Sequence, residues 1–137
     1  MSRTPVDRML CPRSIAVIGA SNNPRKRGYH AVRELLTNGY PHPVYPVNPN
    51  ETEVLGLPAV PALADVPGPI DIVDVFRRPV FAPDVARQAV EVGARVLWLQ
   101  SGVTSDEARR IATDGGLDYI EDACLGVVAS SIAGPAR

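Results

Sequence analysis

Short apolar runs alternate with amphipathic segments along the chain, and this alternation constrains the fold more than any other feature of the sequence. Short, continuous apolar runs are typical of strands that are buried on both faces of a sheet. Strands separated by helices pair in parallel, which leaves only a few α/β topologies. Five runs are expected to form strands, at residues 14–19, 43–48, 71–76, 95–100 and 118–122.

Apolar residues at helical spacing predict three helices between these strands. The first covers residues 28–38, and the second lies between Pro83 and Gly93. The third follows a capping box formed by Thr104 and Glu107 and continues to a Gly-Gly pair. Each helix therefore fills a connection that a parallel sheet requires.

Together these elements predict a single Rossmann-like α/β domain with about five parallel strands in the order 3-2-1-4-5, flanked by helices. The second strand contains Pro46, which cannot donate a ladder hydrogen bond, so this strand is expected to be irregular or near an edge. The sequence contains no internal repeat and no sign of a second domain. We expect residues 1–137 to form one domain with a core at about 12–127 and a frayed tail at 129–137.

Composition excludes several classes of protein. The 14 basic and 15 acidic residues give a net charge of −1, so the overall charge attracts neither nucleic acid nor a membrane. No apolar run approaches the roughly 20 residues of a membrane span. Cys11 and Cys124 form no disulfide framework, and we expect a cytoplasmic protein.

Small and polar residues follow four of the predicted strands. The ligand crevice of an open parallel sheet lies beyond the carboxyl ends of the strands, where the strand order reverses. Small and polar residues are also common in βα loops that bind nothing, but four such loops at the same edge of the sheet favour a binding site. The strand-end residues are Gly19, Ala20, Ser21, Asn48, Pro49, Phe76, Arg77, Arg78, Pro79, Gln100, Ser101 and Gly102.

The first of these loops has the features of a phosphate site. Gly19 permits a close backbone approach, and the helix that follows directs its unpaired N–H groups at the crevice. Side-chain donors and then fixed positive charges come next: Ser21, Asn22, Asn23, Arg25, Lys26 and Arg27. A solvated basic turn is the alternative, but the position of the cluster favours binding of a further phosphate.

Known nucleotide motifs narrow the choice of ligand. A nicotinamide or flavin dinucleotide predicts GxGxxG and an acidic residue at the end of the second strand, whereas this strand ends in Asn48-Pro49. A Walker lysine motif is also missing. An NADP-binding or redox-sensing Rossmann protein is therefore an alternative. The basic residues favour NADP, and Cys124 favours a redox sensor.

Five stretches resemble a known family: "IAVIGAS", "VYPVNP", "LADVPGPIDIVDVFRRP", "VLWLQSGV" and "GLDYIEDACL", in that order. The family is that of the bacterial stand-alone coenzyme A-binding domain proteins. They share their fold with the N-terminal CoA-binding domain of succinyl-CoA synthetase α subunits and of nucleoside-diphosphate-forming acyl-CoA ligases. The resemblance covers nearly all of residues 12–127 and implies coenzyme A, or an acyl-CoA, as the ligand.

The resemblance also implies a role for each strand-end loop. The loop Gly19–Asn23 and its basic neighbours would hold the phosphates of the ADP part. Val47–Pro49 would line the adenine and ribose region. Phe76–Pro79 would lie against the nucleotide and the start of pantetheine, and Gln100–Gly102 would meet the pantetheine arm through backbone groups.

Local sequence pairs no nucleophile with a base. Ser21 and Ser101 lie outside a GxSxG elbow, and His30 and His42 lack the spacing of metal ligands. In the ligases that this chain resembles, the phosphorylated histidine belongs to a following domain. We therefore expect non-catalytic binding of CoA or an acyl-CoA. The alternative is the CoA-binding subunit of a split ligase, which would need a partner subunit. For the oligomeric state, a homodimer is a further alternative.

Two aspartates and a cysteine near the predicted strands were also considered as functional residues. Asp71 and Asp74 lie at i and i+3 on one strand and so face opposite sides, which excludes a carboxylate pair. Asp74 could orient a neighbouring loop through hydrogen bonds.

Cys124 is expected to be a small buried hydrophobe, with a mixed disulfide to the CoA thiol as the alternative. Family members often carry Asp-Arg-Cys followed by Glu-His here, whereas this chain has "DAC" and, at 128–129, "VA".

Overall fold

The computed structural model describes residues 13–123. Its main sheet has five parallel strands in the spatial order β2-β1-β5-β6-β7. These strands are β1 (Ile15–Ile18), β2 (Val44–Val47), β5 (Ile72–Val75), β6 (Val96–Leu99) and β7 (Asp118–Ile120). The Rossmann-like class is confirmed, and each expected strand forms with ends within two residues of the prediction.

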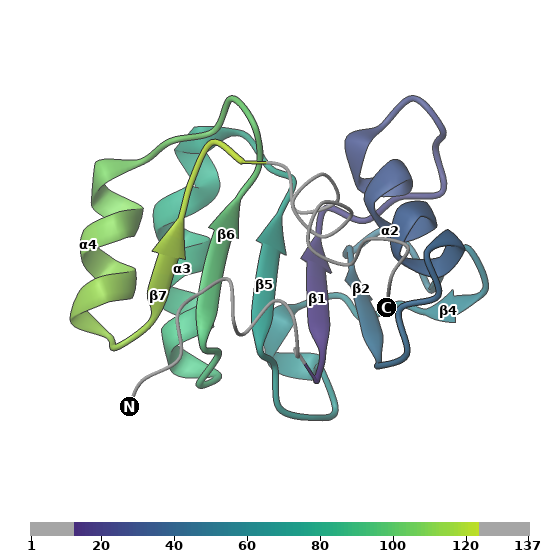
Figure 1. The fold of residues 1–137 in the computed structure, drawn as a ribbon, viewed down its shortest axis with the longest axis horizontal. Coiled ribbons are helices and arrows are strands. Elements are labelled where there is room, and N and C mark those ends of the chain that lie inside the picture. Colours follow the sequence, from purple (N-terminus) through teal and green to yellow (C-terminus); the bar gives the residue numbers. More distant parts are fainter. Residues whose placement is uncertain (1–12, 124–137) are drawn as a thin grey trace, which may run out of the picture.

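Helices cover both faces of the sheet (Figure 1). On one face lies α2 (Arg27–Thr37), and on the other lie α3 (Ala82–Glu91) and α4 (Asp106–Asp114). One buried cluster joins α2 to the sheet through Val32, Leu35, Val17, Ile72 and Trp98. A second joins α3 and α4 to the sheet through Ala86, Ala89, Ala112, Val73 and Leu97. Both faces of the three inner strands β1, β5 and β6 are therefore buried, as continuous apolar runs require.

The predicted strand order is wrong. Counted along the chain, the five main strands lie in the order 2-1-3-4-5, because β5 pairs with β1 instead of lying outside β2. Proline explains the position of β2 at the edge. The carbonyl of Pro46 accepts a hydrogen bond from Val60 N, on the side away from β1, so the missing N–H costs no bond in the β1 ladder.

The chain passes from β2 to β5 without an α-helix. A small antiparallel pair, β3 (Glu53–Val54) with β4 (Leu57–Pro58), precedes a 3₁₀ turn η1 (Leu63–Asp65). A second 3₁₀ turn, η2 (Pro79–Phe81), leads from β5 into α3. Among residues 13–123, no helix has the length and apolar character needed to cross a bilayer.

The N-cap of α4 lies one residue later than predicted. Ser105 is the cap, and its Oγ accepts a hydrogen bond from Ala108 N at 3.1 Å. Glu107 forms an ion pair with Arg87 at 3.1 Å instead of reaching back to the cap. Serine and threonine are both common N-cap residues, with serine the more favourable of the two, so the hydroxyl pattern alone allowed either of these adjacent positions.

Candidate functional site

The candidate site lies where β1 and β5 are neighbours. The chain leaves β1 toward β2 on one side, and from β5 it proceeds to β6 and β7 on the other, so the strand order reverses between them. The carboxyl ends of all five strands share one edge of the sheet (Figure 1). Phe76 N donates to Ile18 O at 2.8 Å, and Gly19 N donates to Val47 O at 3.0 Å. These bonds bring three of the expected strand-end loops together.

Two glycines allow the close packing at this point. Gly19 has φ +87°, and a Cβ there would lie 2.5 Å from the carbonyl oxygen of Phe76. A Cβ on Gly28, in the first turn of α2, would lie only 2.0 Å from the carbonyl oxygen of Gly19. Gly28 was missed from the sequence, although a glycine at the start of a helix after a glycine turn is the signal for close helix–strand packing.

Within the described residues, the loop between β1 and α2 contains two backbone donors without an acceptor, one at the fully buried Ala20 and one at the half-buried Ser21. The first turn of α2 lies against this loop, has no side-chain cap and contains no acidic residue. Unpaired N–H groups and a helix N-terminus are together suited to an anion such as a phosphate.

Asn22 connects this loop to the segment after β2. Its backbone N and its Nδ2 both donate to Glu51 Oε2 at 2.9 Å, and Nδ2 also donates to the Glu53 carbonyl at 2.6 Å. Its Oδ1 accepts from Leu55 N at 3.1 Å. The donors of Asn22 are thus engaged within the protein. Glu51 was not predicted from the sequence, because the dinucleotide motif places its acidic residue at the end of the second strand and Glu51 lies beyond that end.

Neighbouring side chains hold the loop in shape. Ser21 Oγ accepts from Asn23 N at 2.9 Å, and Asn23 Oδ1 accepts from Arg25 N at 3.0 Å. From the end of β2, Asn48 Nδ2 donates to the Ala20 carbonyl at 2.7 Å. Because the peptide groups on both sides of the free amides are held, these amides are oriented before any ligand binds.

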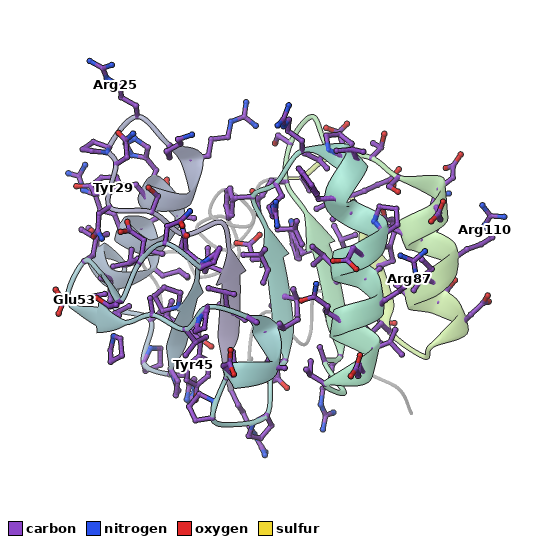
Figure 2. All side chains as sticks on the ribbon, turned by 180° about the vertical axis from the view of Figure 1, so that it is seen from behind. Arg25, Tyr29, Tyr45, Glu53, Arg87 and Arg110 are labelled. Carbon is purple, nitrogen blue, oxygen red and sulfur yellow. The ribbon has the colours of Figure 1, made fainter. Side chains whose placement is uncertain are left out.

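The basic residues of the loop take different directions. Arg25 extends away from the body of the molecule at the tip of the loop (Figure 2). Arg27 turns toward the sheet instead, and its Nη1 donates to the Ser101 carbonyl at 3.0 Å. It thereby joins the first loop to the loop after β6. His30 Nε2 lies 2.7 Å from the carbonyl oxygen of Pro24 and holds the turn between them.

The loops after β2 and β5 form the sides of the site. Val47 is buried, Asn48 is half-buried and Pro49 is exposed. Past β5, Phe76 is half-buried and the exposed segment 77–79 leads into η2. The guanidinium carbon of Arg77 lies 4.1 Å from the ring centre of Phe81, within the range of a cation–π contact. This contact holds a positive charge at the rim of the crevice.

The loop after β6 is a tight turn that is held by several partners. Val103 N donates to the Gln100 carbonyl at 3.0 Å, and Gly102 has φ +83°. Gly102 N donates to Asp122 Oδ1 at 2.7 Å. Beneath the turn, Gln100 Nε2 donates to Asp74 Oδ1. Burial raises the pKa of Asp74 to about 8, and the bond from Gln100 offsets a part of this rise.

No metal centre is found in the part of the chain that the structure describes, since no three His, Cys, Asp or Glu side chains gather there. His42 stacks edge-on against Tyr40 at 5.7 Å, and His30 contacts Pro24, so neither pairs with a serine. Cys11, Cys124 and the "VA" pair at 128–129 lie outside the described residues, as does the tail.

Comparison with known proteins agrees with this geometry. The model of the CoA binding domain family matches residues 13–130. The protein YneT of Bacillus subtilis (strain 168) is 39% identical over 113 residues, which are 82% of each chain. Subunit alpha of the ADP-forming acetate–CoA ligase II of Pyrococcus furiosus is 32% identical over 90% of this chain, but only 29% of that subunit is covered.

A solved structure extends the likeness to three dimensions. A hypothetical protein from Pyrococcus horikoshii OT3 matches with a TM-score of 0.88 and 30% identity, over 98% of this chain and 99% of the other. The family model covers all of the described residues, and the neighbour has a similar fold. The chain therefore belongs to the CoA binding domain family.

Proposed function

We propose that this protein binds coenzyme A or an acyl-CoA in the crevice at the carboxyl ends of the strands and catalyses no reaction on its own. The observation that carries the proposal is the pair of free amides at Ala20 and Ser21, set against the uncapped N-terminus of α2 at the point where the strand order reverses. A diphosphate is the group that this arrangement suits best.

The remaining parts of the ligand would occupy the surrounding loops. Positive charge beside the diphosphate site, at Arg25, Lys26 and Arg27, would hold the 3′-phosphate. Val47–Pro49 would line the adenine and ribose, and Phe76–Pro79 would lie between the nucleotide and the pantetheine arm. The turn Gln100–Gly102 would contact the arm through its backbone. Membership of the CoA binding domain family supports coenzyme A as the ligand.

The absence of a catalytic arrangement within residues 13–123 supports a binding role. Ser21 Oγ accepts from the amide of Asn23, and neither described histidine is hydrogen-bonded to a serine. General-base activation of a serine requires a base within hydrogen-bond reach.

A second candidate function is the CoA-binding subunit of a split acyl-CoA ligase. The observation in its favour is the 32% identity to subunit alpha of an ADP-forming acetate–CoA ligase, of which this chain spans 29%. A ligase would then need the remaining domains from another protein. Affinity purification of the tagged chain from its host tests this alternative: recovery of a nucleotide-binding ligase subunit in a stoichiometric complex would favour it over an independent binder.

Titration calorimetry with CoA, dephospho-CoA and NADP tests the proposed function. We expect CoA to bind, and dephospho-CoA to bind about tenfold more weakly, because a charge-assisted hydrogen bond to a phosphate contributes about 1.5–3 kcal/mol. NADP should bind more weakly than either. No heat with CoA at millimolar concentration would contradict the proposal, and tight NADP binding would instead favour a dinucleotide site.

Replacement of Lys26 by alanine tests where the 3′-phosphate is held. We expect Lys26→Ala, combined with Arg25→Ala, to weaken CoA binding severalfold while dephospho-CoA binding stays nearly unchanged. Arg110→Ala is the matched control, because Arg110 extends from α4 into solvent at the far end of the molecule (Figure 2). Equal losses for both ligands would place the 3′-phosphate elsewhere.

A further inference from the structure

A carboxyl group is buried in the middle of the sheet. Asp74 belongs to the central strand β5, is 1% exposed, and has Val17 of β1 and Trp98 of β6 as its cross-strand neighbours. Its own neighbours Ile72, Val73 and Val75 are all apolar core residues. A polar group at such a position costs free energy unless a partner compensates for it, and neither the fold nor the phosphate site requires a carboxyl there.

The partner of Asp74 comes from the strand-end turn. Gln100 directly follows β6, is 4% exposed, and donates from Nε2 to Asp74 Oδ1. Among the described residues, burial and this hydrogen bond are the two causes that act on the pKa of Asp74. Gln100, the hydrogen-bond donor to this carboxyl, is the first residue of the turn 100–103.

The turn is held from three directions. Asp74 holds Gln100 from below, Arg27 of the first loop donates to the Ser101 carbonyl, and Asp122 after β7 accepts from Gly102 N. Ser101 and Gly102 are themselves exposed. Of the three contacts, only the one from Asp74 is buried, so it is the contact that water competes with least. The backbone of this turn thus has its position fixed from inside the sheet.

We infer that Asp74, acting through Gln100, is a positioning residue for the pantetheine arm of the bound coenzyme. This inference rests on the proposed function. The side chain does not reach the ligand; it fixes the peptide groups of Ser101 and Gly102 at the edge of the crevice. Pre-orientation of these groups lowers the entropy that binding of a long, flexible arm would otherwise lose.

Two ligands separate this role from a general contribution to the fold. Coenzyme A carries the pantetheine arm, whereas adenosine 3′-phosphate 5′-diphosphate lacks it and keeps the 3′-phosphate and the diphosphate of the coenzyme. We expect Asp74→Ala to weaken CoA binding about tenfold, equivalent to about 1.4 kcal/mol, while the affinity for the nucleotide without the arm changes less than about twofold. Asp74→Asn keeps an oxygen that accepts from Gln100 Nε2, and it should restore most of the CoA affinity.

Further variants keep the test decisive. Should Asp74→Ala not fold, Gln100→Ala removes the same contact from the other side and should give the same pattern. Asp71→Asn is the matched control, since this carboxyl precedes the same strand and pairs with Arg95 at 3.4 Å instead of with the turn. It should leave the ratio of the two affinities unchanged.

The outcomes separate the two proposals. Equal losses for both ligands, or unchanged CoA affinity in Asp74→Ala and Gln100→Ala, would overturn the positioning role while the proposed function stands. Failure of the wild-type protein to bind either ligand would overturn the proposed function itself. A selective loss for CoA that Asp74→Asn restores would support both.

Discussion

Gly28→Ala is expected to destabilise the protein by about 3 kcal/mol and to abolish most ligand binding. The added Cβ would lie 2.0 Å from the Gly19 carbonyl oxygen, 2.8 Å from its carbon and 3.0 Å from the Ala20 Cα. All three are backbone atoms, which cannot turn aside as a flexible side chain can. The first turn of α2 must then move away from the loop, and overpacking of this kind costs about 1–3 kcal/mol or more.

The sign of this change distinguishes packing from helix propensity. Alanine is favoured over glycine in a helix interior by about 1 kcal/mol, so propensity alone predicts a more stable protein. Steric contact predicts the opposite. Urea unfolding followed by the fluorescence of Trp98, the only tryptophan of the chain and a buried one, measures the difference. Titration with CoA shows whether displacement of α2 also removes the phosphate site.

Gly68→Ala is the matched control for this substitution. A Cβ at Gly68 would meet only the hydroxyl of Tyr45, at 3.2 Å, and that side chain can shift. We expect the stability of Gly68→Ala to stay within about 1 kcal/mol of the wild type, with a small gain from the restricted unfolded chain. A Gly28→Ala protein as stable as Gly68→Ala would mean that α2 does not rest on the Gly19 loop.

The strands and helices could be predicted because the signal for each is local. "IAVI", "DIVDVF" and "VLWL" are apolar runs bounded by turn residues, and strands buried on both faces need little else. Helix α4 shows the limit of such signals. Its start depends on which of two adjacent hydroxyl residues, Thr104 or Ser105, has the extended backbone, and this is decided by the path of the preceding turn.

Strand order could not be predicted because it depends on long-range pairing. The local pattern of β5 is the same whether it lies beside β1 or outside β2. The one informative residue is Pro46, which indicated an edge position for β2 and so argued against the predicted order. The observed pairing of β1 with β5 places Phe76 against Gly19, a contact that the predicted order would not contain.

The candidate site was predictable as a set of loops but not as a set of contacts. Small and polar residues at strand ends indicated which segments would meet at the edge of the sheet. The partners of Asn22 and Ser21 depend on the conformation of the loop, which turns these side chains toward Glu51 and Asn23. Glu51 comes from a segment whose hairpin carried no recognised signal, and Asp74 acquires its partner only across the sheet.

Asp74→Asn is expected to make the protein more stable than the wild type at pH 8 and to flatten its pH dependence. Stability falls with rising pH wherever the folded state holds more protons than the unfolded state. In the unfolded chain the carboxyl loses its proton near pH 3.8, whereas burial raises its pKa to about 8 in the folded protein. Its contribution is thus complete below about pH 4 and is lost progressively until about pH 8.

The slope of this loss sets the size of the effect. Each unit of pH between these limits removes up to about 1.4 kcal/mol from the free energy of unfolding. Asparagine has no proton to lose and still accepts a hydrogen bond from Gln100. The difference in unfolding free energy, variant minus wild type, should therefore grow from about pH 4 to about pH 8 and then become constant. Urea unfolding at a series of pH values measures it.

Asp71→Asn tests whether the pH dependence of stability comes from the buried carboxyl of Asp74 or from removal of any negative charge near this strand. That variant breaks the ion pair with Arg95 but leaves Asp74 in place, so it should lower stability while keeping the slope of the wild type. Parallel curves for Asp74→Asn and the wild type would instead show that water reaches the carboxyl in the folded protein. The hydrogen bond to Gln100 would then be exposed to competition from solvent, and the argument that Asp74 fixes the turn from inside the sheet would fail.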